Sequence, residues 1–141
     1  MDRARDVMNK NVLTISEDAT VEEAIRGLLQ HHISGMPVVD HGGRLVGIIT
    51  EFQLLEALYA PEVKKLRVRE LMTRDVTTVS ENTALTDVAG MLVMQRIRRI
   101  PVVRDGKVIG IIARRDLLRY IMQSEGSLEG FFSKMLTYVP A

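Results

Sequence analysis

The chain of 141 residues carries one sequence pattern twice. Met8, Ser16-Glu17 and Met36-Pro37-Val38-Val39 recur at one constant offset as Met72, Ser80-Glu81 and Ile100-Pro101-Val102-Val103. After the prolines the offset drops by one residue, at a place where a hairpin turn tolerates a deletion. One copy alone is too small to bury much core, so the repeat predicts two units in one compact module. Any ligand pocket is expected in the seam between the copies.

The composition is that of an ordinary globular protein, with 46% hydrophobic and 4% aromatic residues. The chain has no cysteine, which excludes disulfides, thiol nucleophiles and cysteine metal sites and fits a reducing compartment. Its first residues are charged, and no apolar run approaches membrane-spanning length. We therefore expect a cytoplasmic protein with no targeting signal and no membrane anchor.

Charge is distributed unevenly along the chain. Residues 1–64 hold six basic and ten acidic side chains, a net charge of −4, whereas residues 65–141 hold thirteen and eight, a net charge of +5. Solvated complementary faces, or a dimer in which unlike halves meet, explain this asymmetry. Attraction of an anionic ligand to the second half is the alternative explanation.

Apolar residues at helical spacing predict one helix early in each copy. Thr20 and Glu23 form a T-x-x-E capping box at the start of the first of these helices. The predicted apolar faces consist of Val21, Ala24, Ile25, Leu28, Leu29 and His32 in the first copy and of Leu85, Val88, Ala89, Leu92 and Val93 in the second.

Two short runs rich in β-branched residues follow each helix, at 36–39 and 45–49 and again at 100–103 and 108–112. Turn residues separate the runs of each pair, which predicts a strand, a turn and a strand. Lead-in strands are expected near 12–15 and 76–79, and closing helices at 51–59 and 114–122. The predicted fold class is therefore α/β (α+β), with two β-α-β-β-α units.

The predicted organisation has a first unit at residues 1–64, a second unit at 65–123 and a C-terminal appendage at 124–141. Pro61 and the charged stretch 64–69 link the two units. The appendage begins with turn residues, and residues 131–139 have an amphipathic pattern. A tail packed on its own domain and an element for docking or dimerisation both explain that pattern.

Three motifs occur in the same order in both copies. They are Asp6-Val7-Met8 and Glu70-Leu71-Met72, Ser34-Gly35-Met36-Pro37-Val38-Val39-Asp40 and Arg98-Arg99-Ile100-Pro101-Val102-Val103, and Gly47-Ile48-Ile49-Thr50 and Gly110-Ile111-Ile112-Ala113. From residue 6 to about residue 122 the chain thereby resembles the CBS domain family, whose modules come in tandem pairs. The resemblance implies a pseudo-twofold axis and often a disc-shaped homodimer. It also implies regulatory binding of AMP, ADP, ATP or S-adenosylmethionine in two clefts between the units.

The same resemblance implies a ribose site in the pattern Gly-apolar-apolar-Thr/Ser-x-x-Asp, whose aspartate holds the ribose hydroxyls. Asp116 has this position in the second copy, but Ala113 replaces the hydroxyl residue. In the first copy Thr50 is present, while Gln53 stands where the carboxylate belongs and lacks its charge. We therefore expect the main cleft at Asp116 and a second, weaker cleft at Thr50, Gln53 and Thr77.

Arg98 and Arg99 lie where related modules carry basic residues that meet nucleotide phosphates, and planar guanidinium groups bind phosphates in a bidentate manner. Arg115 adds positive charge beside a helix N-terminus, which itself favours anions. The resemblance also implies further residues around the main cleft, with an apolar wall for the adenine at Ile111. These further residues are Asn11, Leu13, Ile33, Ser34 and Gly35.

Each candidate also has an explanation without a ligand. Thr50 and Gln53 form an ordinary capping box. Asp116 lies in the first turn of a helix, where an acidic residue interacts favourably with the helix dipole. Arg98 and Arg99 can pair with carboxylates of a partner copy.

Several functional classes lack their sequence signals. His31 and His32 are neighbours and His41 lies in a turn, so we expect no metal site. We also expect no enzyme, no catalytic residue and no catalytic cofactor, since the chain has no nucleophile elbow, P-loop or carboxylate pair. The basic second half comes without a helix-turn-helix, zinc finger or aromatic platform, which argues against nucleic-acid binding.

The sequence thus predicts a stand-alone regulatory homodimer that senses an adenine nucleotide and signals to an unidentified regulated protein. The alternative is a ligand-independent dimerisation or interaction scaffold with degenerate clefts, because Ala113 and Gln53 each break the motif. A nucleic-acid accessory is a third hypothesis. Thermal stabilisation by adenine nucleotides is expected only for the first, and salt-sensitive binding to polyphosphate backbones only for the third.

Overall fold

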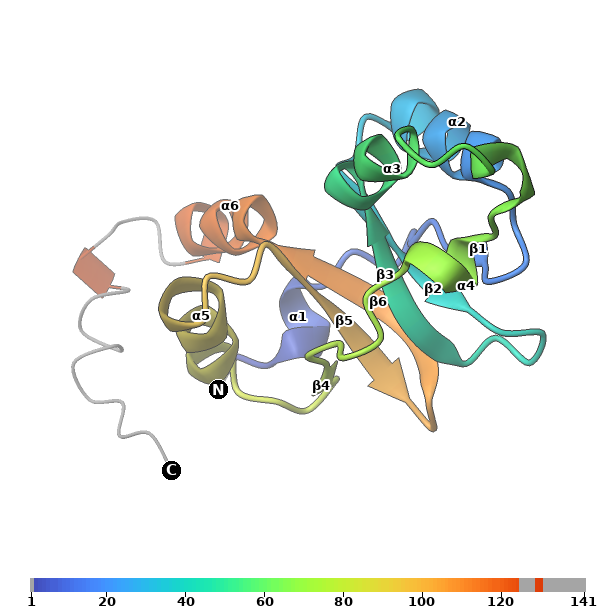
Figure 1. Ribbon diagram of the computed structural model, residues 1–141. Helices are drawn as coiled ribbons and strands as arrows, with labels where there is room; N and C mark the ends of the chain where they lie inside the picture. The colour runs from blue at the N-terminus through green and yellow to red at the C-terminus, as the bar shows by residue number, and fades with distance from the viewer. Residues whose placement is uncertain (1, 125–128, 131–141) are drawn as a thin grey trace. The chain divides into compact units, whose positions relative to one another are not determined.

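The computed structural model describes residues 2–124 and 129–130, so most of the predicted appendage lies outside the described residues (Figure 1). Contacts divide the chain into two compact units. The β1–β3 unit comprises residues 13–76 with 105–108, and the β4–β6 unit comprises the described residues among 2–12, 77–104 and 109–124. The predicted mixed α+β fold class is confirmed, with one three-stranded sheet in each unit.

In the β1–β3 unit, β1 pairs parallel to β2, and β2 pairs antiparallel to β3, with Gly35 opposite Thr50. Helices α2 and α3 contact each other and lie side by side in Figure 1. Buried apolar residues from the sheet and helices, such as Met36, Val38 and Ile49, form its core. The elements are β1 (Ile15–Ser16), α2 (Val21–His31), β2 (Gly35–Val39), β3 (Leu45–Thr50), α3 (Glu51–Ala57), the 3-10 helix η1 (Val63–Lys65) and α4 (Val68–Leu71).

The β4–β6 unit repeats this arrangement. Strand β4 pairs parallel to β5, with Val79 opposite Val102, and β6 lies on the other side of β5. Ile100, Val102 and Ile112 are fully buried in its core. The elements are α1 (Ala4–Val7), β4 (Val79–Ser80), α5 (Leu85–Met94), β5 (Arg99–Arg104), β6 (Lys107–Ala113) and α6 (Arg114–Ser124).

The predicted order of helices and strands is confirmed, but the lead-in segments differ from the prediction. Only two residues of each lead-in form a strand, β1 and β4, and the stretch expected to be a charged link contains η1 and the start of α4. Such short elements have no periodicity from which a sequence pattern can be recognised.

The two short helices are exchanged between the sequence copies. Helix α1 lies at the start of the first copy, in the lead-in segment 2–12, but belongs to the β4–β6 unit, where the Ala4 N–H donates to the Thr83 carbonyl at 2.8 Å. Helix α4 lies at the start of the second copy, in the lead-in segment 65–76, but belongs to the β1–β3 unit, where the Val68 N–H donates to the Ala19 carbonyl at 2.9 Å. Each unit is therefore completed by the lead-in of the other copy.

Each exchanged lead-in segment has a methionine, Met8 or Met72, whose side chain packs directly against a glycine of the neighbouring strand. A Cβ added at Gly110 would lie 2.5 Å from the Met8 sulfur, and one at Gly47 would lie 2.6 Å from the Met72 sulfur. At Gly47 the added atom would also lie 2.8 Å from the backbone oxygen of Thr73. Glycine is therefore needed here for close approach of the lead-in segments.

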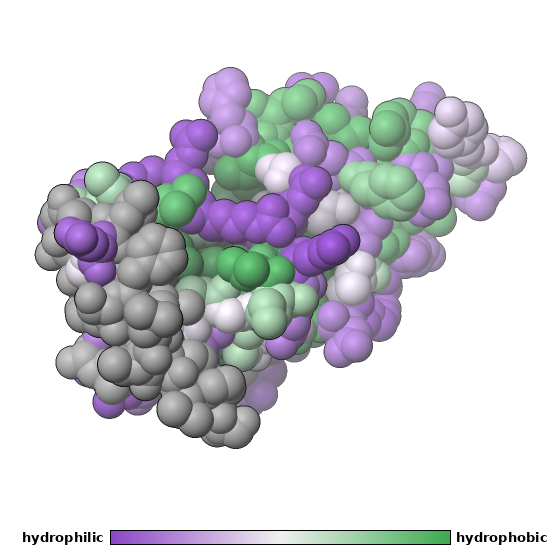
Figure 2. Space-filling view, turned by 90° about the vertical axis from the view of Figure 1, so that its left-hand side faces the viewer, coloured by the Kyte–Doolittle hydropathy of each residue, from purple (hydrophilic) through white to green (hydrophobic). Residues whose placement is uncertain are grey.

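The predicted apolar faces of α2 and α5 are only partly buried. Leu29 and Val93, which are equivalent in the two copies, have 67% and 70% of their surface exposed, so the predicted faces extend beyond the buried core. His32, also assigned to that face, is exposed and ends α2 with a left-handed backbone at φ 52°. Each of these helices thus carries apolar side chains outside the core that it covers. Figure 2 shows hydrophobic side chains at the surface among hydrophilic ones.

Candidate functional site

Asp116 lies in the first turn of α6, where its side chain caps the helix start. Its Oδ2 accepts a hydrogen bond from the Ala113 N–H at 2.8 Å, and its Oδ1 lies 3.4 Å from Nη1 of Arg119. The Asp116 side chain is 17% exposed. One carboxylate oxygen thus binds the helix start, while the other has a long contact with an exposed arginine as its one partner among the described residues.

The same arrangement recurs at other helix starts, where the third residue accepts from the backbone N–H of the N-cap residue. The distances are 2.7 Å from the Arg3 N–H to Asp6, 2.8 Å from the Arg67 N–H to Glu70 and 3.4 Å from the Thr20 N–H to Glu23. The predicted capping box of α2 is therefore confirmed. A structural role also belongs to Asp116, whatever else it binds.

Gln53 has the equivalent position at the start of α3, and its side chain has partners at both ends. Its Oε1 accepts from the Thr50 N–H at 2.9 Å and from the Thr50 hydroxyl at 3.3 Å. Its Nε2 donates to Oγ1 of Thr73, which follows α4. The predicted capping box at Thr50 and Gln53 is confirmed, and a ligand role for these residues stays a prediction.

The pairing of β2 with β3 brings four of the predicted ligand residues together at one end of the β1–β3 sheet. Gly35 lies opposite Thr50, and the Ser34 carbonyl accepts from the Glu51 N–H at 3.0 Å. The structure therefore brings Ser34 and Gly35 to the start of α3, beside Thr50 and Gln53.

Leu13 and Ile33 belong to the same unit, but they pack against its hydrophobic core. Core packing explains both residues without a ligand. A role for either one in a cleft stays a prediction.

In the β4–β6 unit, other predicted ligand residues lie near the start of α6. Arg99 begins β5 and Ala113 ends β6, so both lie at the edge of the sheet where α6 starts with Asp116. Arg99 is half-buried and engaged in interactions, whereas Arg98 and Arg115 are exposed. This edge therefore combines a carboxylate with guanidinium groups at the start of an eleven-residue helix.

The N-terminal lead-in runs beside this edge. Asn9 and Ile111 exchange backbone hydrogen bonds of 2.9 and 3.0 Å, and the Asn9 side-chain oxygen accepts from the Asn11 N–H at 3.0 Å. Asn9 thereby connects Asn11 with Ile111, two residues before Ala113, and a role for Asn11 and Ile111 in the main cleft stays a prediction. Thr77 is exposed and belongs to this unit, whereas Thr50 and Gln53 belong to the other. The grouping of residues from both units in one cleft stays a prediction.

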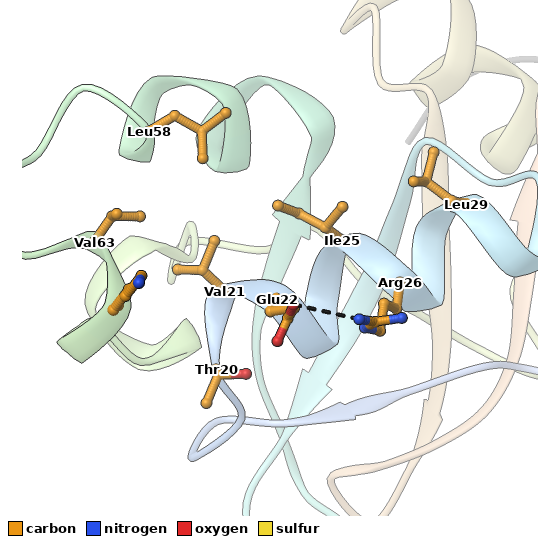
Figure 3. A pocket seen from close by; sticks show the side chains of 9 residues that line it. Thr20, Val21, Glu22, Ile25, Arg26, Leu29, Leu58 and Val63 are labelled. Carbon is orange, nitrogen blue, oxygen red and sulfur yellow. Dashed lines mark hydrogen bonds and ion pairs between the residues drawn. The ribbon is translucent and has the colours of Figure 1, made fainter.

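The β1–β3 unit also has a groove of about 810 Å³ on its helical side (Figure 3). Val21 and Ile25 point from α2 toward Leu58 and Val63. A Glu22–Arg26 ion pair of 3.3 Å lies on the same helix. The groove contains none of the predicted ligand residues, and its lining is completed by Thr20, Leu29 and Lys64.

An ion pair fixes the loop after β4. Arg104 donates to Glu81 from Nε at 3.1 Å and from Nη2 at 2.7 Å, and this contact holds the pKa of the Glu81 carboxyl below its usual value. Glu81 also accepts, through its carbonyl, the backbone N–H of Arg5 in the N-terminal lead-in at 3.0 Å. The loop thus connects β5 with the lead-in.

Among residues 2–124 and 129–130, no group of three or more His, Asp or Glu side chains is placed to hold a metal ion. None of the helices in this described part is long and apolar enough to cross a membrane.

Two sheet-and-helix units, each with an acceptor at the third residue of its closing helix, match a known family. The chain belongs to the CBS domain family, whose model matches residues 4–60 and 68–123. The resemblance drawn from the repeated motifs is confirmed.

Two solved CBS-pair structures are similar over most of this chain. CBSX2 from Arabidopsis thaliana, in complex with AMP, is 31% identical with a TM-score of 0.79 and covers 89% of this chain and 99% of its own. The CBS domain pair of protein MJ0100, in complex with 5-methylthioadenosine and S-adenosyl-L-methionine, is 33% identical with a TM-score of 0.75. It covers 87% of this chain and 98% of its own.

Among curated relatives, inosine-5'-monophosphate dehydrogenase of Methanocaldococcus jannaschii is 39% identical over 118 residues, which are 83% of this chain. That match covers only 23% of the relative, and two further relatives from this organism are covered over 42% and 22% of their length. The chain therefore corresponds to a part of these larger proteins.

Two residues that contact the predicted ligand residues were not predicted from the sequence. Thr73 binds the Gln53 amide from the exchanged lead-in, and no pattern in the sequence indicates that exchange. Arg119 pairs with Asp116 at a spacing of three residues, which is a recognisable helical signal.

Proposed function

We propose that this chain binds an adenine nucleotide, AMP, ADP or ATP, or the related S-adenosylmethionine, as a regulatory ligand. The AMP complex of CBSX2, whose chain this one matches over 99% of its length, supports the proposal most strongly. The complex of the MJ0100 pair with two adenosine-containing ligands supports the same class of ligand. The module does no chemistry on the ligand and signals its occupancy to a partner protein that is not yet identified.

Asp116 is the proposed ribose ligand. An ionised carboxylate only accepts hydrogen bonds, through about four lone-pair sites, and the two ribose hydroxyls are donors. Charge-assisted hydrogen bonds of this kind are about twice as strong as neutral ones. Because Oδ2 receives the Ala113 N–H, Oδ1 and the remaining lone pair of Oδ2 are the proposed acceptors.

Arg98, Arg99 and Arg115 are the proposed phosphate ligands. Their guanidinium groups belong to the same edge of the β4–β6 unit as the start of α6, and helix N-termini favour anions. The net positive charge of the second half of the chain supports attraction of the anion. Ile111 and Asn11 complete the proposed adenine side of this cleft.

The proposed signal is a shift between arrangements of the module. A ligand changes such an equilibrium only by its differential affinity for the two arrangements, and a partner that recognises one of them responds to occupancy. The scaffold hypothesis differs in one respect, since it predicts no effect of any adenine ligand.

We further propose that the chain forms a homodimer through its exposed helical side chains. The exposed positions repeat, since Leu29, Leu55 and Tyr59 of the first copy are equivalent to Val93, Leu118 and Met122 of the second. A twofold dimer brings the same surface of both chains together, and exposed apolar patches mark such contacts. The apolar groove in Figure 3 belongs to this proposed surface, because Leu29 and Leu58 line it.

Calorimetric titration of the full chain with AMP, ADP, ATP, S-adenosylmethionine and GTP tests the nucleotide proposal. We expect at least one adenine ligand to bind and Asp116→Asn to weaken it about tenfold or more, since a hydrogen bond to a charged group contributes about 1.5–3 kcal/mol. Asparagine keeps an oxygen for the Ala113 N–H, so the helix start is preserved.

Asp6→Asn is the matched control, because Asp6 also accepts an N-cap N–H at the third residue of a helix in the same unit. It is expected to bind the ligand like the wild type. No binding at millimolar ligand, or equal weakening by both variants, contradicts the proposal and favours the scaffold.

A further inference from the structure

We infer that the chain binds one nucleotide, and not two, because internal hydrogen bonds occupy the first copy's counterpart of Asp116. The inference rests on the proposed function and adds the number of nucleotides bound per chain. It is carried by the difference between Gln53 and Asp116, which have the same position at the start of α3 and α6 but different partners.

The acceptor oxygen of Gln53 is saturated. An amide oxygen has two lone pairs, and Oε1 of Gln53 faces both the N–H and the hydroxyl of Thr50, at 2.9 and 3.3 Å. A ribose diol needs acceptors for its hydroxyl protons. Gln53 has no lone pair left for them unless the start of α3 gives up its own contacts.

The nitrogen end of Gln53 is fixed as well. Its Nε2 donates to the Thr73 hydroxyl, and the Thr73 backbone is held to β3 by hydrogen bonds of 2.9 Å in both directions with Ile48. The amide is therefore tied between α3 and the exchanged lead-in. Turning Gln53 toward a ligand would break contacts with both segments.

The second copy differs at each of these points. Ala113 has no hydroxyl, so Asp116 receives only the backbone N–H from its N-cap residue. Asn9, the counterpart of Thr73, directs its side-chain oxygen to the Asn11 N–H at 3.0 Å. Because residue 113 has no hydroxyl, no side-chain donor competes with a ligand for the Asp116 carboxylate. The carboxylate therefore keeps acceptor sites that the Gln53 oxygen does not have.

The number of AMP molecules bound per chain, measured by calorimetry on the full-length protein, tests this inference. We expect one AMP per chain in the wild type, and in Asp116→Asn the same single site with affinity lowered about tenfold or more. We expect two in Gln53→Asp, because a third-residue aspartate already starts α1 and α6, and its shorter side chain releases Thr73.

Thr73→Val is the control for the contact with the lead-in. It frees the Gln53 nitrogen but leaves its oxygen saturated, so one AMP per chain is expected. Circular dichroism verifies the fold of each variant before titration.

The outcomes separate the inference from the function on which it rests. Two AMP molecules in the wild type, or unchanged affinity in Asp116→Asn, overturn the inference while nucleotide binding stands. One AMP in a folded Gln53→Asp protein overturns the claim that Gln53 closes its site. Absence of binding in the wild type at millimolar AMP overturns both proposals.

Discussion

At the scale of single residues, the third position of a helix serves both the backbone and the proposed ligand. Asp6, Glu70 and Asp116 each place a carboxylate oxygen within 2.7–2.8 Å of an N-cap N–H. A carboxylate has acceptor sites beyond the one that the helix uses, whereas the Gln53 oxygen has none. The capping position and the proposed ribose position can therefore coincide at Asp116.

The sequence predicted the capping boxes at Thr20 and Thr50 because the spacing of the residues defines them. It could not predict the contact of Gln53 with Thr73, since these residues meet only through the exchanged lead-in. Ala113 has two consequences for the Asp116 site. The sequence pattern predicts a weaker site because a hydroxyl ligand is missing, and that prediction stands untested. In the structure the residue offers Asp116 only its backbone N–H, so no side-chain hydroxyl occupies a carboxylate acceptor site.

Gly47→Ala is expected to destabilise the fold more than Gly110→Ala. At Gly47 the new methyl group would lie 2.8 Å from the backbone oxygen of Thr73, which cannot rotate away. At Gly110 the nearest atoms belong to the flexible Met8 side chain. Overpacking costs about 1–3 kcal/mol, and urea unfolding measures it.

The double variant Met8→Ala/Gly110→Ala supplies the control for this prediction. It is expected to lose less stability than the two single changes added together, since the smaller side chain at position 8 makes room for the methyl group. Equal losses for Gly47→Ala and Gly110→Ala would contradict the difference that we draw between backbone and side-chain contacts.

At the scale of elements, periodic segments were predictable and short ones were not. Helices α2, α5 and α6 and the two long strand pairs follow from their apolar patterns. Helices α1 and α4 have four residues each and gain their stability from the unit on which they pack. Their exchange between the copies is a tertiary property, which a repeat in the sequence does not reveal.

The exchange predicts which fragments fold. A fragment of residues 13–76 contains the β1–β3 unit with α4, whereas residues 1–64 lack α4 and its buried Val68. We expect the first fragment to show a cooperative thermal transition by circular dichroism. The second is expected to melt at a lower temperature or without a transition.

These fragments have the same length, so chain length does not explain a difference between them. A fragment of residues 1–64 that is as stable as residues 13–76 would show that α4 adds nothing to its unit. The repeat boundary at residues 64 and 65 would then also be the folding boundary.

At the scale of the whole molecule, the proposed dimer accounts for apolar side chains that neither core uses. Leu55→Asp with Leu118→Asp is expected to convert a dimer into monomers, because it places charges on equivalent positions of both copies. Light scattering coupled to gel filtration measures the mass. Thr14→Asp, a change of an exposed residue that precedes β1, is the control and should leave the dimer intact. A monomeric wild type contradicts the proposed dimer.

The central claim is that an adenine nucleotide binds at Asp116 and not at Gln53. The most direct measurement is an amide nuclear magnetic resonance titration with AMP, in which the Ala113 and Thr50 N–H groups report on the two helix starts. If AMP binds at Asp116 alone, the Ala113 signal shifts until it saturates and the Thr50 signal does not move. Equal shifts at both positions would contradict the single site, and no shift at either position would contradict nucleotide binding itself.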